Sequence, residues 1–189
     1  MQDVYNRARN IRVAIFDVDG VLTDGALYYA DSGEESKAFS VYDGHGMKML
    51  RESGVALAII SSRSSRSLEA RARNLGIELL FQGAADKLAA FSELLGRCGT
   101  GAEACAYVGD DLVDLPVMRR CGLAVAVPDA PALVRRQAQY VTRARGGRGA
   151  AREFCEIILH AQGFLAARLA DYGEKMSGRD ATMTAGRHS

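Results

Sequence analysis

The chain has 189 residues, of which 48% are hydrophobic and 25% charged, and its net charge is +1. This composition is typical of one globular domain with an ordinary core. The charge and the absence of a dominant Lys/Arg block argue against nucleic acid as an obligate partner. No apolar stretch is long enough to cross a bilayer, and the first residues lack the apolar core of a secretion signal. We therefore expect a cytoplasmic protein with no membrane partner.

After a polar lead-in at residues 1–10, the apolar run at residues 13–16 predicts a buried strand followed by Asp17, Asp19 and Gly20. Alternation along an ideal strand would place the two carboxylates on opposite faces. Gly20 permits a sharp turn, so Asp19 can swing back beside Asp17. These acids could hold a divalent cation, act as nucleophile or proton donor, or simply be turn residues.

Residues 26–41 predict a β-hairpin flap, because two β-prone runs surround a turn of sequence DSGEE. Tyr28, Tyr29 and Phe39 are bulky for an isolated hairpin, which would be marginally stable in water. We expect the flap to pack against another subunit. The alternative is that it folds back on its own domain.

The rest of the chain alternates between apolar strands and amphipathic helices, up to residue 163. Residues 42–46 are expected to form a loop that opens a helix ending at Gly54. Further strands are expected at residues 55–60, 78–81, 105–108, 123–127 and 139–142, and a last helix at 150–162. The pattern predicts an α/β, Rossmann-like three-layer fold with a parallel central sheet and helices on both faces.

Two segments outside this pattern have no predicted secondary structure. The basic loop at residues 143–149 is either a flexible linker or a lid, since residues 146–149 and the C-terminal tail could close over an adjacent site. Residues 164–189 are expected to be a polar tail that does not fold independently.

Polar side chains follow several of the predicted strands, and parallel strands end at one edge of a sheet. They are Asp17, Asp19, Ser61, Lys87, Asp110, Asp111 and Asp114. Crowded carboxylates repel one another unless a cation lies among them, and oxygen ligands favour Mg²⁺. A zinc site is not expected, because the three histidines are scattered and the four cysteines lack C-x-x-C spacing.

This set of residues predicts phosphoryl transfer. Asp17 would attack phosphorus to give an aspartyl-phosphate, and Asp19 would act as general acid and then as general base. Mg²⁺ would be held by Asp17, Asp110 and the main-chain carbonyl of Asp19, while Ser61 and Lys87 would hold the phosphate oxygens. The remaining acids, Asp111 and Asp114, would orient water ligands or Lys87.

Each of these residues also has a purely structural interpretation. Ser61 could cap a helix, Lys87 could be a solvated helix residue, and Asp110 and Asp111 could be acids at a helix start. Their joint occurrence, each directly after its strand, favours the catalytic interpretation.

Four motifs resemble those of the haloacid dehalogenase superfamily of phosphatases. They are DVDGV at residues 17–21, Ser61, Lys87 and GDDLVD at 109–114. Longer stretches, KAFSVYDG at 37–44 and YVGDDLVDLPVM at 107–118 among them, resemble the phosphatases that act on 3-deoxy-D-manno-octulosonate 8-phosphate in lipopolysaccharide biosynthesis. The similarity runs from residue 11 to residue 163. Ser61-Ser62-Arg63 departs from the family, where Thr-Gly-Arg is expected.

The resemblance implies a Mg²⁺-dependent hydrolysis that yields the free sugar acid and phosphate. It also implies a homotetramer whose hairpins form a central barrel, with no large cap domain. Besides Asp19 and Lys87, it implies the following contacts to the sugar acid or its phosphate: Ser40, Val41, Tyr42, Asp43, Gly44, Lys48, Arg63 and Arg71.

Two other functions share part of this pattern. A phosphatase of the sialic-acid type, acting on a nonulosonate 9-phosphate, would carry the same motifs. A receiver domain of a signalling relay also combines Asp, a hydroxyl, Lys and Mg²⁺. In a receiver the phosphorylated Asp lies on a middle strand, whereas here the D-x-D motif follows the first strand and Lys87 precedes the last acid cluster.

Overall fold

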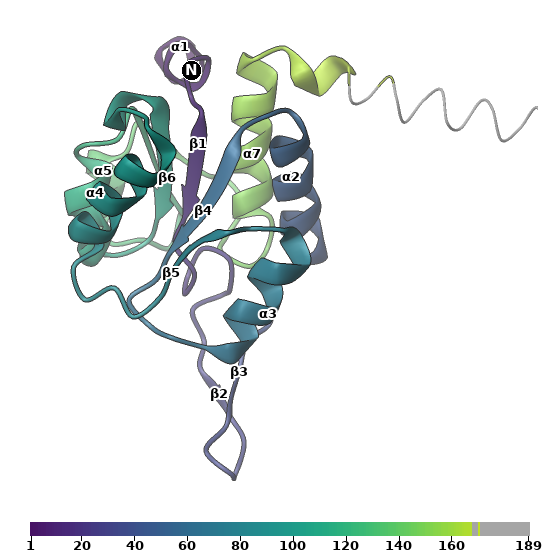
Figure 1. Cartoon of the computed structure of the whole chain (residues 1–189), viewed down its shortest axis with the longest axis vertical. Helices are drawn as coiled ribbons and strands as arrows, with labels where there is room; N and C mark the ends of the chain where they lie inside the picture. The colour runs from purple at the N-terminus through teal and green to yellow at the C-terminus, as the bar shows by residue number, and fades with distance from the viewer. Residues whose placement is uncertain (168–169, 171–189) are drawn as a thin grey trace, which may run out of the picture.

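In the computed structural model the chain forms a central six-stranded sheet between two layers of helices (Figure 1). The structure describes residues 1–167 and 170. The strand order is β5-β4-β1-β6-β7-β8 and every pairing is parallel, as predicted. The strands are β1 (Val13–Phe16), β4 (Ala56–Ile60), β5 (Leu79–Phe81), β6 (Cys105–Gly109), β7 (Leu123–Ala126) and β8 (Tyr140–Val141).

Helices cover both faces of this sheet, which confirms the predicted three layers. One layer contains α2, α3 and α7, and the other contains α4 and α5 (Figure 1). The helices are α1 (Gln2–Ala8), α2 (Val41–Glu52), α3 (Arg66–Leu75), α4 (Lys87–Cys98), α5 (Leu115–Met118), α6 (Ala132–Gln137) and α7 (Ala150–Ala161), with 3-10 turns η1 (Ala102–Ala104) and η2 (Leu112–Asp114). No helix in the described part of the chain combines the length and hydropathy that a bilayer span requires.

The central strand is apolar along its whole length, because layers of helices cover it on both faces. All four residues of β1 are buried, and Phe16 packs edge-on against Phe154 of α7, with the ring centroids 5.2 Å apart. The core therefore fixes the end of β1, where the acidic loop begins.

Helix α2 begins earlier than predicted, since the expected loop at residues 42–46 is helical. The Ser40 side chain accepts a hydrogen bond from the Asp43 N–H at 3.3 Å, which is a typical N-cap. Both oxygens of the Asp43 carboxylate then bind the start of α7, through the N–H groups of Gly149 at 3.2 Å and Arg152 at 2.8 Å. These contacts outweigh the loop tendency of the two glycines in that run.

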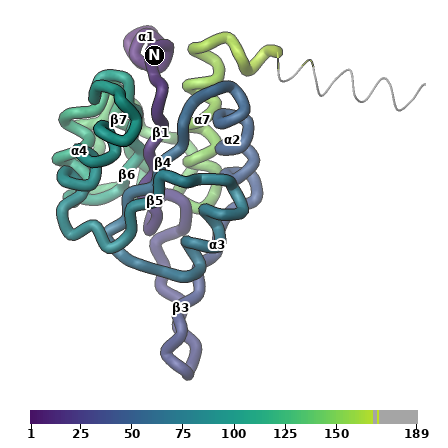
Figure 2. The backbone as a smooth tube through the Cα atoms, in the orientation of Figure 1, coloured from purple at the N-terminus to yellow at the C-terminus, as the bar shows by residue number. Residues whose placement is uncertain are grey.

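The predicted flap is present as a hairpin that projects from the domain (Figures 1 and 2). Its strands β2 (Tyr28–Tyr29) and β3 (Glu35–Ser36) are only two residues long each. The second strand is shorter than expected because the chain turns back at once: Phe39 packs against the core, and Ser40 caps α2. The described residues contain no cap domain beyond this hairpin.

The basic loop at residues 143–149 is docked on its own domain, so the prediction of a flexible linker is wrong. The Gly147 N–H donates to the Val21 carbonyl at 2.9 Å. The Glu153 carboxylate accepts from the N–H groups of Arg143 and Ala144, each at 3.0 Å. Of the expected tail, residues 164–167 are helical and Leu165 packs against the core, whereas residues 168–169 and 171–189 lie outside the described residues.

Candidate active site

The candidate site lies at the carboxyl ends of β1 and β6, where the chain changes direction across the sheet. After β1 the chain adds β4 and β5 on one side and then returns to place β6 on the other. Crevices at such switch points are the usual ligand sites of open α/β sheets. Asp17 directly follows β1, and its N–H continues the ladder by donating to the Val108 carbonyl at 3.0 Å. Asp110 directly follows β6.

Gly20 lets the acidic loop lie directly against Asp110. Its φ is +97°, and a Cβ at this position would lie 2.1 Å from Asp110 Oδ2. A side chain would therefore be strained by the backbone conformation and would also collide with the neighbouring carboxylate. The Thr23 hydroxyl holds the turn by accepting from the N–H groups of Gly20 at 3.4 Å and Gly25 at 3.2 Å.

A buried lysine lies between two of the predicted acids. Lys87 Nζ is 2.6 Å from an oxygen of Asp17 and 2.6 Å from an oxygen of Asp114. Burial opposes the ammonium charge, yet these carboxylates raise the pKa of Lys87 above its ordinary value. Asp114 also accepts from the Tyr107 hydroxyl at 2.6 Å and from the Asp110 N–H at 2.9 Å. It therefore holds both Lys87 and the loop that carries Asp110.

Three carboxylates meet at this point. One oxygen each of Asp17, Asp110 and Asp114 lies within 4.8 Å of the others. Burial raises the pKa of Asp17, and the Asp114 charge raises it further. Burial, followed by the Asp17 charge, also raises the pKa of Asp110. Because Asp114 is already bound to Lys87, Tyr107 and backbone N–H groups, Asp17 and Asp110 are the pair that fits a small divalent cation such as Mg²⁺.

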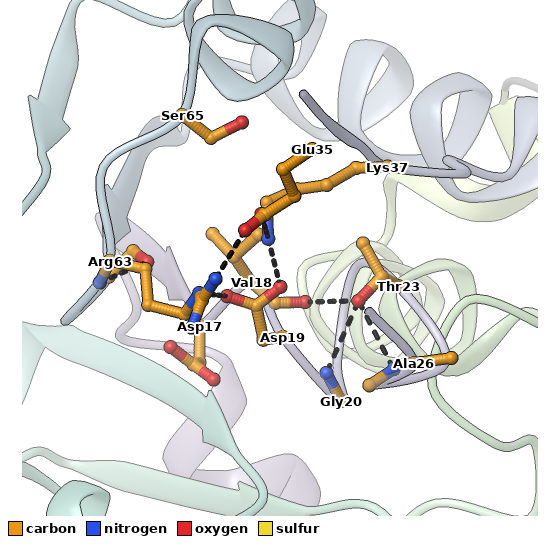
Figure 3. Close-up of polar contacts among 12 residues, drawn as sticks. Asp17, Val18, Asp19, Gly20, Thr23, Ala26, Glu35, Lys37, Arg63 and Ser65 are labelled. Carbon is orange, nitrogen blue, oxygen red and sulfur yellow. Dashed lines mark hydrogen bonds and ion pairs between the residues drawn. The ribbon is translucent and has the colours of Figure 1, made fainter. Parts of the chain in front are cut away.

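Asp19 faces the flap (Figure 3). Its carboxylate accepts a hydrogen bond from Lys37, and Arg63 Nε lies 3.8 Å away. Glu35 of β3 binds the same two cations, with Lys37 at 3.0 Å, and also pairs with Arg63. Lys37 and Glu35 therefore tie the second half of the flap to its own domain, whereas Leu27, Tyr28 and Tyr29 in its first half are exposed.

Sequence reasoning missed Lys37 and Glu35 as parts of this network. The lysine side chain is only 3% exposed, although charged residues are seldom buried unless they are paired. The available signal was a lysine placed directly before the apolar Ala38 and Phe39. Its partner could not be found in the sequence, because Asp19 lies 18 residues away.

Ser61 lies at the same edge of the sheet, two residues beyond Ile59, which pairs with Phe16 of β1. It is 2% exposed, and its hydroxyl accepts from the Arg63 N–H at 3.2 Å. The helix that follows begins only at Arg66, with Ser65 at the cap position. Ser61 is therefore not a helix cap. Asp111, by contrast, is exposed and caps η2, where its side chain accepts from the Leu112 N–H at 2.7 Å.

The residues predicted to contact substrate divide into two groups. Ser40, Val41 and Tyr42 line an open cleft of about 500 Å³, and Lys48 is exposed further along α2. Asp43 instead uses both carboxylate oxygens to bind the start of α7.

Arg71 and Gly44 belong with Asp43 in the second group. Arg71 donates to the Ser40 carbonyl at 2.8 Å and lies over the Phe39 ring at 5.8 Å. Gly44 lies beneath the Arg71 guanidinium, which a Cβ at that position would meet at 2.2 Å. These three residues support the cleft wall.

A second cleft, of about 340 Å³, adjoins the first and reaches Asp110. Asp24 and Arg148 line both clefts, and Arg145 lines the second. None of these three was among the residues predicted to form the site. Their role depends on how the loop at residues 143–149 docks beside the acidic loop, which no local pattern reveals.

Comparison with known proteins agrees with this geometry. Residues 39–122, which include Ser61, Lys87 and Asp110, match the sequence model of haloacid dehalogenase-like hydrolases. The chain is 53% identical over 160 residues to the 3-deoxy-D-manno-octulosonate 8-phosphate phosphatase KdsC of Yersinia pestis, covering 85% of this chain and 86% of that one.

Two solved structures superpose closely. A probable YrbI family phosphatase from Pseudomonas syringae gives a TM-score of 0.90 at 55% identity, covering 91% of this chain and 98% of that one. A 3-deoxy-D-manno-octulosonate 8-phosphate phosphatase from Moraxella catarrhalis, solved with magnesium ion, phosphate ion and KDO, gives 0.89 at 43%, covering 91% and 99%. The chain therefore belongs to the haloacid dehalogenase-like hydrolases, in the family of the 3-deoxy-D-manno-octulosonate 8-phosphate phosphatases.

Proposed function

We propose that the chain is a Mg²⁺-dependent phosphatase that hydrolyses 3-deoxy-D-manno-octulosonate 8-phosphate to the free sugar acid and phosphate. The main support is that Asp17 and Asp110, at the ends of adjacent strands, bring their oxygens within 4.8 Å of each other beside a buried lysine. The identity of the substrate is inferred from the names of the relatives described above. The Moraxella structure contains the corresponding sugar acid together with a magnesium ion and a phosphate ion.

The reaction uses Asp17 and Asp19 in two steps. An Asp17 carboxylate oxygen attacks phosphorus and forms an aspartyl-phosphate, while Asp19 gives a proton to the departing sugar oxygen. A water molecule then attacks phosphorus, Asp19 takes the proton of that water, and Asp17 is regenerated as phosphate leaves. Asp19 must exchange its contacts with Lys37 and Arg63 for these proton transfers.

The remaining residues hold the phosphate and the cation. Bound at Asp17, Asp110 and the Asp19 main-chain carbonyl, Mg²⁺ would screen the nucleophile from the negative charge of the phosphate. The Ser61 hydroxyl and the Lys87 ammonium bind phosphate oxygens, and Asp114 keeps Lys87 in place.

The test is phosphate release by the purified chain from 3-deoxy-D-manno-octulosonate 8-phosphate and from a nonulosonate 9-phosphate of the sialic-acid type. We expect kcat/KM to be at least tenfold higher for the first substrate. Equal rates, or preference for the second, would overturn the proposed substrate and favour the alternative described above. Loss of phosphate release in EDTA, restored by Mg²⁺, is the expected control.

We propose further that the enzyme is a cytoplasmic homotetramer that serves lipopolysaccharide biosynthesis. The exposed Leu27, Tyr28 and Tyr29 of the projecting hairpin support assembly through the flap, because clustered large apolar side chains favour protein contacts. Sedimentation velocity should give a tetramer for the wild type and smaller species for Leu27→Asp. A monomeric wild type would contradict this assembly.

A further inference from the structure

The two clefts beside the acidic loop meet at the guanidinium of Arg148, to which the proposed chemistry assigns no role. Arg148 lines both clefts, so one side chain lies between the part that reaches Asp110 and the part formed by residues 38–42. An elongated substrate with its phosphate at Asp17 and Asp110 would have to pass this point to reach the outer cleft, which is the cleft lined by residues 38–42.

The docking of the loop explains how Arg148 is held there. The Gly147 N–H donates to the Val21 carbonyl, and a Cβ at Gly146 would lie 1.8 Å from the Gly20 carbonyl oxygen. Only a residue without a side chain permits so close an approach of the two backbones. Arg148 follows directly and is anchored to the loop that carries the nucleophile.

Charge pairing separates Arg148 from the other cations of the site. Lys37 and Arg63 are paired with Glu35 and Asp19, and Lys87 is paired with Asp17 and Asp114. Among residues 1–167 and 170, none of the ion pairs involves Arg148. Its influence on Asp24 is a weaker attraction, after the hydrogen bonds of that carboxylate to Ala26 and Tyr28. The side chain is exposed and its donors are available.

The neighbouring helix end does not offer an alternative anion site. The N–H groups of Gly149 and Arg152 at the start of α7 already bind the Asp43 carboxylate. Of the residues that line the outer cleft, Arg148 is the one that carries a positive charge, so it is the cationic partner for an anion that enters there. A guanidinium is suited to bind a carboxylate through two parallel hydrogen bonds.

We propose that Arg148 binds the carboxylate of the sugar-acid phosphate and thereby selects carboxylated substrates over neutral sugar phosphates. This inference rests on the proposed function and adds a specificity-determining residue to it. The phosphate oxygens are bound by Ser61 and Lys87, and a cation at Asp17 and Asp110 would screen their charge. Arg148 therefore contributes to the recognition of the sugar end and not to the chemical step.

The test compares two substrates in three variants. For Arg148→Ala we expect kcat/KM on 3-deoxy-D-manno-octulosonate 8-phosphate to fall by about 10- to 100-fold, mainly through KM, because a charge-assisted contact is lost. Turnover of p-nitrophenyl phosphate, which has no carboxylate, and inhibition by inorganic phosphate should change less than about twofold. Arg148→Lys should recover only part of the loss, since an ammonium cannot form the paired contact.

Arg143→Ala is the matched control, because this exposed arginine belongs to the same loop but lines neither cleft. Equal losses on both substrates in Arg148→Ala, or no loss on either, would overturn the inference. If the wild type prefers the nonulosonate 9-phosphate, the proposed substrate is wrong. The same comparison made with that carboxylated ester would still decide the role of Arg148.

Discussion

At the scale of single residues, the site depends on Asp17 and Asp110, two carboxylates whose charged forms are disfavoured by burial. Asp17 is 5% exposed and has one cationic partner, Lys87, which it shares with Asp114. Burial raises the pKa of Asp17, so the lysine and a bound cation are needed to keep it ionised as a nucleophile.

Asp17→Asn tests the nucleophile directly. The amide cannot form the aspartyl-phosphate, so phosphate release should fall by at least about 10⁴-fold. The neutral side chain also removes a buried charge, and the thermal midpoint should therefore not drop. Asp31→Asn, at the exposed turn of the hairpin, is the control and should retain full activity. Appreciable turnover by a folded Asp17→Asn would refute this role.

At the scale of elements, α2 and α7 are joined by one buried carboxylate. Asp43 accepts from two N–H groups at the start of α7 while its own N–H is capped by Ser40. The contact crosses 109 residues of sequence and holds the helix that follows the loop of Arg148.

Asp43→Ala should destabilise the protein by about 1–3 kcal/mol, because two partly buried N–H groups lose their acceptor. Asp43→Asn keeps one acceptor oxygen and should cost less. Chemical denaturation measures both. If the two variants are equally stable, or if alanine costs nothing, the contact does not link the helices as we describe.

How far the sequence could predict the elements depends on the range of the contacts that form them. The strands and most helices could be predicted from local apolar patterns. Residues 57–60 are an example, because such an apolar run becomes buried whichever side chains pack against it. The start of α2 did not, because the acceptor that holds it binds residues 149 and 152. The docked position of the loop at residues 143–149 could not be predicted for the same reason. Its glycines indicate flexibility in the sequence, whereas in the structure they allow close packing against the backbone of residues 20–24.

The residues of the candidate site also divide into those that the sequence could predict and those that it could not. Asp17, Lys87, Asp110 and Asp114 were predicted to meet because each follows a strand of one parallel sheet, and the structure brings them together. Lys37 and Arg148 were not predicted, since each arrives from a loop whose path is set by tertiary contacts. Their positions follow no strand register.

At the scale of the whole molecule, metal and proton compete for the same acids. Because folding raises the pKa of Asp17 and Asp110, the folded state holds protons that the unfolded chain has already lost. Without metal, their contribution to stability therefore falls as pH rises from the ordinary value of 3.8 through the raised values.

Mg²⁺ should therefore stabilise the protein more at pH 8 than at pH 5. At about 100 times its Kd it should add about 2.7 kcal/mol at pH 8, or about 5–10 °C in Tm. Thermal melts with Mg²⁺ and with EDTA at both pH values measure this difference. Asp110→Asn should abolish most of the Mg²⁺ effect. A Tm gain that is equal at both pH values, or that persists in Asp110→Asn, would argue against this metal site.

The backbone bond from Asp17 to Val108 has a further consequence for the molecule as a whole. The amide of the nucleophile belongs to the ladder between the two central strands, so it can meet solvent only when those strands separate. Hydrogen–deuterium exchange at Asp17 should then be as slow as in the most protected core amides, whereas the amides at the tip of the hairpin exchange rapidly. The backbone of the nucleophile would thus leave its position only on global unfolding, even while the entrance to the site fluctuates.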